Sequence, residues 1–259
     1  MNLRFNTALL ALAMLMPFGA SAQLITVAPP PLPYYAQPPA PGDDYIWTPG
    51  YWAWSAAEGD YYWVPGTWVE APSVGDLWTP GYWAYEGSGF LWHPGYWGLN
   101  VGFYGGVNYG YGYSGTGYRG GHWDHRHFVR AAQAISQGPG RGQVSFHGGP
   151  GGNRVRPPAQ NSHARPEEHR APSELQMQHE HAAVARPAQR ATGAHEHPLV
   201  AATPRPSAFE APGAEHARGG PPARQQPGRP APPAARGGQP EHAPQAPPAR
   251  HEQEPRREH

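Results

Sequence analysis

Histidine pairs are the residues of this chain whose type and spacing most directly suggest chemistry. Imidazole binds zinc, copper or nickel, and 14 of the 15 histidines lie from His122 onward. A His-x-His spacing occurs three times, and the six candidate metal ligands are His125, His127, His179, His181, His195 and His197. His-rich tracts are possible metal binders on composition. A segment rich in Arg, His, Pro and Ala also produces such pairs by chance, so we expect no cofactor.

Carboxylates are the second group that could react. Between Gln23 and Tyr118 the chain has no Lys or Arg and seven acids, namely Asp43, Asp44, Glu58, Asp60, Glu70, Asp76 and Glu86. Paired carboxylates can hydrolyse a glycoside, but most of these acids lie in or beside short connectors rich in small residues, where solvated turn carboxylates are expected. The sequence contains no nucleophile elbow, no phosphate-binding glycine loop before a helix and no cysteine. We therefore predict that the protein is not an enzyme.

A tryptophan motif, W-x-P-G-x-W, recurs four times. Its copies start at Trp47, Trp63, Trp78 and Trp92. Each copy has two short β-prone runs around Pro-Gly, a pair that favours a type II turn because glycine accepts the positive φ. The pattern predicts a hairpin within each copy, with its two tryptophans opposed across the turn. The fold class that follows is mainly β, a small Trp-rich antiparallel meander followed by a long disordered tail.

The motif tryptophans would share one face of that meander, because side chains alternate along strands. The candidate binding face comprises Trp47, Trp52, Trp63, Trp68, Trp78, Trp83, Trp92 and Trp97. Exposed rings of this kind bind sugars by stacking. The favoured alternative is that the rings form the core, since so short a block barely buries itself and tryptophan is its main apolar area. Both can hold, because a single-layer sheet covers one face and exposes the other.

Composition divides the chain into five segments. Residues 1–22 combine a basic start, a short apolar run and an Ala-x-Ala site, which is typical of a secretory signal peptide. Residues 23–43 are proline-rich and predicted to be an extended spacer. The repeats occupy 44–100, a Gly/Tyr-rich segment with a possible short helix occupies 101–137, and a low-complexity tail occupies 138–259. No segment of the mature chain is long and apolar enough to span a membrane.

Two local predictions concern the Gly/Tyr-rich segment. Tyr109, Tyr111 and Tyr113 alternate with glycines, which predicts either a further strand with one aromatic face or a flexible glycine-rich stretch. Apolar residues at i, i+3, i+4 and i+7 from Phe128 predict a helix over 127–137.

The tail is predicted to be disordered and basic. Its 122 residues include 22 Pro, no Trp and no Tyr, so burial cannot offset the entropy of ordering them. From Arg119 onward the chain has 18 Arg and 12 acids, whereas the repeats are acidic. Because the tail mixes both charges and export is predicted, we expect no nucleic-acid partner.

The four motifs, the Gly/Tyr segment ending in GYRGGHW and the signal peptide together resemble the bacterial WXXGXW (YXWGXW) repeat family. The resemblance covers about Tyr45 to Phe128. It implies an exported envelope protein of Gram-negative bacteria, with no enzymatic activity and no catalytic residue to transfer.

The functional expectation is an exported, non-enzymatic structural or interaction protein of the cell envelope, in the periplasm or at the cell surface. Its partners would be an envelope glycan or another envelope protein. One alternative is a carbohydrate- or peptidoglycan-binding module that uses an exposed Trp/Tyr face, and another is metal binding by the His-rich tail. The sequence determines neither the ligand nor the oligomeric state.

Overall fold

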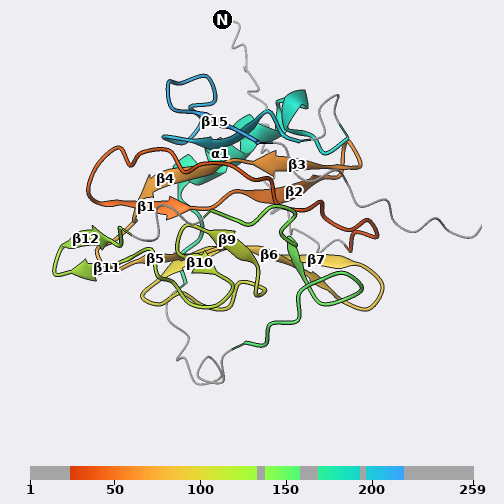
Figure 1. The fold of residues 1–259 in the computed structure, drawn as a ribbon, viewed down its shortest axis with the longest axis horizontal. Helices are drawn as coiled ribbons and strands as arrows, with labels where there is room; N and C mark the ends of the chain where they lie inside the picture. Colours follow the sequence, from red (N-terminus) through yellow and green to blue (C-terminus); the bar gives the residue numbers. More distant parts are fainter. Residues whose placement is uncertain (1–23, 133–137, 158–168, 193–196, 219–259) are drawn as a thin grey trace, which may run out of the picture. The chain divides into compact units, whose positions relative to one another are not determined.

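The computed structural model describes residues 24–132, 138–157, 169–192 and 197–218. The described chain is mainly β and forms several small sheets, most of their strand pairs antiparallel, as predicted (Figure 1). The predicted signal peptide and residues 219–259 of the predicted tail lie outside the described residues. Contacts between Cα atoms divide the chain at residue 222, and every described residue belongs to the first unit. Within the described part, no helix has the length and apolar character needed to cross a membrane.

The four tryptophan motifs form eight short strands. They are β1 (Tyr45–Thr48), β2 (Tyr51–Ser55), β3 (Asp60–Val64), β4 (Gly66–Glu70), β5 (Leu77–Thr79), β6 (Tyr82–Tyr85), β7 (Phe90–His93) and β8 (Tyr96–Gly98). Strand β1 pairs with β4 and β2 with β3, while β5 pairs with β8 and β6 with β7. Each long hairpin is therefore built from two consecutive motifs. We call the first one hairpin A (residues 45–70) and the second one hairpin B (residues 77–98).

The prediction of one hairpin per motif is wrong. In hairpin A, Trp47 pairs with Trp68 and Trp52 with Trp63, so the two tryptophans of one motif do not face each other. The chain turns in the connectors, and each Pro-Gly pair lies at the junction between the two strands of its motif. Hairpin B has the same arrangement.

The register explains where proline is tolerated. Thr48 pairs with Thr67 before the interruption and Tyr51 with Val64 after it, which places the Pro-Gly of one motif opposite the Pro-Gly of the next. Proline has no N–H to donate to a ladder. Opposing the two Pro-Gly pairs confines the missing hydrogen bonds of both strands to one place.

The motif glycines are required because a tryptophan ring lies so close to each of them that a side chain would not fit. A Cβ atom at Gly66 would lie 2.5 Å from the Trp47 ring, and one at Gly50 would overlap the Trp63 ring in the same way. In hairpin B the Trp92 ring covers Gly81 and the Trp78 ring covers Gly95. These four glycines do not have positive φ, so the predicted type II turn is also wrong. The first tryptophan of each motif packs on the glycine of its partner motif.

The paired tryptophans also contact each other. Ring centroids are 5.2–5.3 Å apart in the four pairs Trp47–Trp68, Trp52–Trp63, Trp78–Trp97 and Trp83–Trp92. Their tilted and edge-to-face geometries are the favourable ones for aromatic rings and contribute about 0.5–1.5 kcal/mol beyond burial.

The Gly/Tyr-rich segment forms a tight hairpin, where the sequence predicted a single strand or a flexible stretch. Strands β9 (Asn108–Gly110) and β10 (Tyr113–Ser114) pair around Tyr111 and Gly112. Tyr111 has a φ of 51°. The next hairpin consists of β11 (Gly121–Asp124) and β12 (His127–Arg130).

The helix predicted over 127–137 is wrong at residues 127–130, which are strand β12. Phe128 pairs across the hairpin with Trp123, and the two rings make an edge-to-face contact. That cross-strand contact outweighs the helical spacing of the apolar residues. Residues 133–137 lie outside the described residues.

Parts of the predicted tail, from residue 138 onward, are described and contain secondary structure. It contains β13 (Phe146–His147), α1 (Glu174–Val184), the 3₁₀ turn η3 (Pro187–Gln189), β14 (Val200–Thr203) and β15 (Glu215–His216). Strand β13 joins β6 and strand β14 joins β4, both in parallel. Ala183, Ala201 and Ala202 are fully buried. The tail thus buries small residues against the rest of the fold and needs few large apolar residues of its own.

The proline-rich segment is part of the core, which corrects its prediction as a spacer. Leu32 and Tyr35 are buried in it. The indole N–H of Trp52 donates to the Pro31 carbonyl and that of Trp68 to the Pro38 carbonyl. Proline offers a carbonyl acceptor without an N–H that must itself be paired, so this run suits a core of indole donors.

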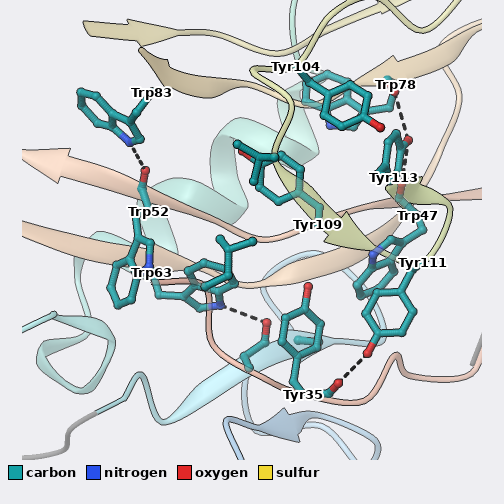
Figure 2. Packing of buried hydrophobic residues seen from close by; sticks show 14 of the residues in the cluster. Tyr35, Trp47, Trp52, Trp63, Trp78, Trp83, Tyr104, Tyr109, Tyr111 and Tyr113 are labelled. Carbon is teal, nitrogen blue, oxygen red and sulfur yellow. Dashed lines mark hydrogen bonds between the residues drawn. The ribbon is translucent and has the colours of Figure 1, made fainter. Parts of the chain in front are cut away.

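Hydrogen bonds from aromatic side chains join the two long hairpins (Figure 2). The indole N–H of Trp83 in hairpin B donates to the Trp52 carbonyl in hairpin A at 2.8 Å. The Tyr113 hydroxyl lies 3.3 Å from the Trp47 carbonyl and 3.0 Å from the Trp78 carbonyl. The core therefore lies between hairpins A and B and includes the β9–β10 hairpin.

The Trp–Gly packing predicts that Gly81→Ala destabilises the fold. The new methyl group overlaps the Trp92 ring, and overpacking of this kind costs about 1–3 kcal/mol. Urea unfolding measures the loss. The control is Gly140→Ala, where the nearest neighbouring atom is 3.6 Å from the added Cβ. Equal stability of the two variants would show that the Trp92 ring does not need a glycine beneath it.

The burial of Trp78 predicts that Trp78→Ala leaves the protein unfolded or nearly so. Its side chain exposes 6% of its surface, and removal of a buried aromatic side chain costs about 3–5 kcal/mol, a large part of a small domain's stability. Far-UV circular dichroism reports the loss of structure. A Trp78→Ala protein that melts near the wild-type temperature would contradict a core role.

Candidate functional site

The eight tryptophans predicted as a binding face lie in the hydrophobic core. Seven of them expose at most 6% of their surface, and Trp92 is partly buried against the same cluster. Several indole N–H groups are also used within the fold, as in the bonds from Trp63 to the Ala201 carbonyl and from Trp97 to Gln176. In this conformation these rings do not present a stacking surface for a sugar.

Buried tyrosines complete the hydrogen bonding of the core. The Tyr109 hydroxyl donates to the Gly81 carbonyl at 2.7 Å. The Tyr111 hydroxyl donates to the Tyr35 carbonyl (Figure 2). Burial raises the pKa of Tyr109 and of Tyr113 well above the usual value. These phenols therefore stay protonated and act as hydrogen-bond donors.

His179, a predicted metal ligand, is a buried structural residue. Its Nδ1 accepts from the backbone N–H of Ser207 at 2.8 Å, so the proton lies on Nε2, which donates to the Pro65 carbonyl at 2.9 Å. Burial lowers the pKa of His179 to about 4. Both ring nitrogens are occupied by these bonds, which leaves none for a metal. Its predicted partner His181 is exposed on α1.

The other predicted histidine ligands are dispersed. His125 and His127 flank the β11–β12 turn and are exposed, with His125 2.7 Å from Asp124. His197 is described and half-buried, whereas His195 lies outside the described residues. Across the described ranges, no group of three or more His, Asp or Glu side chains is placed to hold a metal ion.

Asp76 contradicts the expectation of solvated turn carboxylates. It is buried and accepts from the Arg170 guanidinium at 2.5 and 2.6 Å through its two oxygens. The Arg170 backbone also exchanges two hydrogen bonds with Trp97. This ion pair anchors the start of the described 169–192 segment beside strand β5. Sequence spacing gave no signal for it, because the two residues are 94 positions apart.

An open groove beside this ion pair is the candidate functional site. Its volume is about 360 Å³, and its walls include Leu77, Leu99, Tyr118, His122 and Trp123. Leu99 exposes 61% of its surface. Aromatic and aliphatic side chains in a concave surface with polar neighbours are the usual composition of a binding site.

Trp123 is held in a defined orientation in this groove. Its indole N–H donates to the Asp76 carbonyl at 2.9 Å, and its ring packs against Phe128. The ring is partly exposed, unlike those of most motif tryptophans. The motif-based prediction missed it because Trp123 lies outside the repeats. Only Trp54 and Trp123 among the tryptophans lie outside the four motifs. That separation was the signal in the sequence that could have identified Trp123.

The comparisons with known proteins identify the repeat. The family model of the WXXGXW repeat matches two copies, at residues 42–69 and 77–97. Each copy corresponds to one long hairpin, so the unit of this family is a pair of W-x-P-G-x-W motifs, as in the structure. No curated protein and no solved structure matches the chain.

The low pKa of His179 predicts acid destabilisation. An unfolded histidine titrates near 6.5, so between pH 6.5 and 4 the unfolded chain takes up a proton that the folded chain excludes. The contribution of His179 to the free energy of unfolding should be constant above pH 6.5. It should lower the free energy of unfolding by about 3 kcal/mol as the pH drops to 4.

Urea unfolding at several pH values checks this expectation. His179→Gln removes the titration and should flatten that part of the pH dependence, whereas the exposed control His181→Gln should keep the wild-type slope. Identical slopes in all three proteins would exclude His179 as the titrating group.

Proposed function

We propose that this chain, which has two matches to the WXXGXW repeat model, is an exported, non-enzymatic interaction protein of the Gram-negative cell envelope. The observation that supports this proposal is that several of the side chains capable of acid–base or metal chemistry are engaged in contacts within the fold. His179, Asp76 and the buried tyrosines are each engaged in contacts that hold the fold. A scaffold whose ionisable groups are engaged in this way is suited to display a surface.

Export is supported by residues 1–22, with their basic start, apolar run and Ala-x-Ala site. The full chain should be processed after Ala22 and recovered in the periplasmic or surface fraction. Mass spectrometry of the purified protein and cell fractionation test this. Recovery of an unprocessed chain in the cytoplasmic fraction would overturn the export proposal.

A second candidate function is carbohydrate or peptidoglycan binding, and the groove of Trp123 favours it. A partly exposed indole fixed by a hydrogen bond offers a stacking surface at little entropic cost. This site replaces the motif tryptophans as the candidate platform. The metal-binding alternative receives less support, because His179 is occupied.

Sedimentation with purified peptidoglycan tests the groove. Mature protein should co-sediment, and Trp123→Ala should lower the bound fraction several-fold while the protein stays folded. The matched control is Trp54→Ala, because Trp54 is also partly buried and packs against Tyr61, away from the groove lining. Equal binding by both variants would rule out this groove, and no binding by the wild type would remove the carbohydrate alternative.

A further inference from the structure

We propose that a cavity between hairpins A and B binds a small organic cation, with Glu180 as its anionic partner. The cavity has a volume of about 90 Å³ and is separate from the groove of Trp123. It is thus independent of the proposed function. All four W-x-P-G-x-W motifs contribute to its wall, and helix α1 contributes Gln176, His179 and Glu180.

The cavity lies beside the opposed Pro-Gly pairs of the motifs. At the opposed Pro-Gly pairs the strands lack ladder hydrogen bonds and glycine has no side chain. Pro49, Pro65, Gly81 and Gly95 line the cavity there. Its volume admits a head group of a few non-hydrogen atoms and is too small for a large ligand.

Glu180 supplies a negative charge without a cationic partner. Its carboxylate accepts from the Tyr51 hydroxyl at 2.9 Å and from the Tyr62 hydroxyl at 3.2 Å. Burial, reinforced by Glu180, raises the pKa of Tyr51 and of Tyr62, so both remain neutral donors.

The neighbouring charged groups leave this charge uncompensated. Among the ion pairs of the described residues, none involves Glu180. His179 is neutral because its Nδ1 accepts a backbone N–H. Arg186, at the end of α1, pairs with Glu210. A cation bound in the cavity would neutralise the negative charge of Glu180.

The remaining walls favour an organic cation over a metal ion. Tyr51, Trp78 and Trp92 line the cavity, and the Tyr51 and Trp92 rings are stacked 5.1 Å apart. Aromatic rings attract ammonium groups within about 6 Å of the ring centre. Hard metal ions require about six or more oxygen ligands, whereas here the single carboxylate already accepts two hydrogen bonds.

Titration of the mature protein with tetramethylammonium chloride tests the proposal. Indole NMR signals of Trp78 and Trp92 should shift saturably in the millimolar range. Sodium chloride controls for ionic strength, and the neutral isostere tert-butanol controls for shape. Because these probes compare charge in the wild-type protein, the test does not depend on a variant that folds. No saturable shift, or an equal response to tert-butanol, would overturn the proposal.

A matched pair of variants tests the role of Glu180. Glu180→Gln should weaken tetramethylammonium binding about tenfold, as expected for loss of a charge partner. Glu174→Gln removes the same charge from an exposed position on the same helix and should bind like the wild type. Melting temperatures confirm that both variants fold. Wild-type affinity in folded Glu180→Gln would exclude Glu180 as the anionic partner.

Discussion

The reciprocal packing of tryptophan on glycine is the contact on which the other features of this fold depend. Trp47 covers Gly66 and Trp63 covers Gly50, and hairpin B repeats the exchange. The contact requires two motifs in antiparallel register, because each ring reaches the glycine of the other strand. It explains why the motif contains glycine without a positive φ, and why the family repeat spans two motifs.

Such an aromatic core creates a need for hydrogen-bond acceptors. Indole N–H groups and tyrosine hydroxyls are costly to bury unpaired, and this fold pairs many of them with backbone carbonyls. The proline-rich segment provides carbonyls at Pro31 and Pro38, and strand carbonyls such as those of Gly81 and Trp52 accept others. The proline-rich composition therefore complements the tryptophan-rich composition within one core.

This packing determines which residues hold the fold together and which line its concave surfaces. Ionisable groups that sequence reasoning singled out, such as His179 and Asp76, hold the described tail against the hairpins. Two concave surfaces formed by the described residues are the groove of Trp123 and the cavity beside Glu180. Both are built where the described tail or the β11–β12 hairpin meets the long hairpins, so a repeat block alone would lack their complete walls.

The residues alone predicted the mainly β class, the WXXGXW repeats and a core role for the motif tryptophans, because periodicity and composition are local properties. They did not predict which strands pair. Local turn chemistry favours a hairpin at each Pro-Gly, but a tryptophan can cover a glycine only when the partner motif lies opposite, and that choice is made by packing over many residues. The same reason applies to the tail and to Trp123. Ala201, Ala202 and Asp76 are buried by surfaces that distant segments provide, and no count of a segment's own apolar residues contains that information.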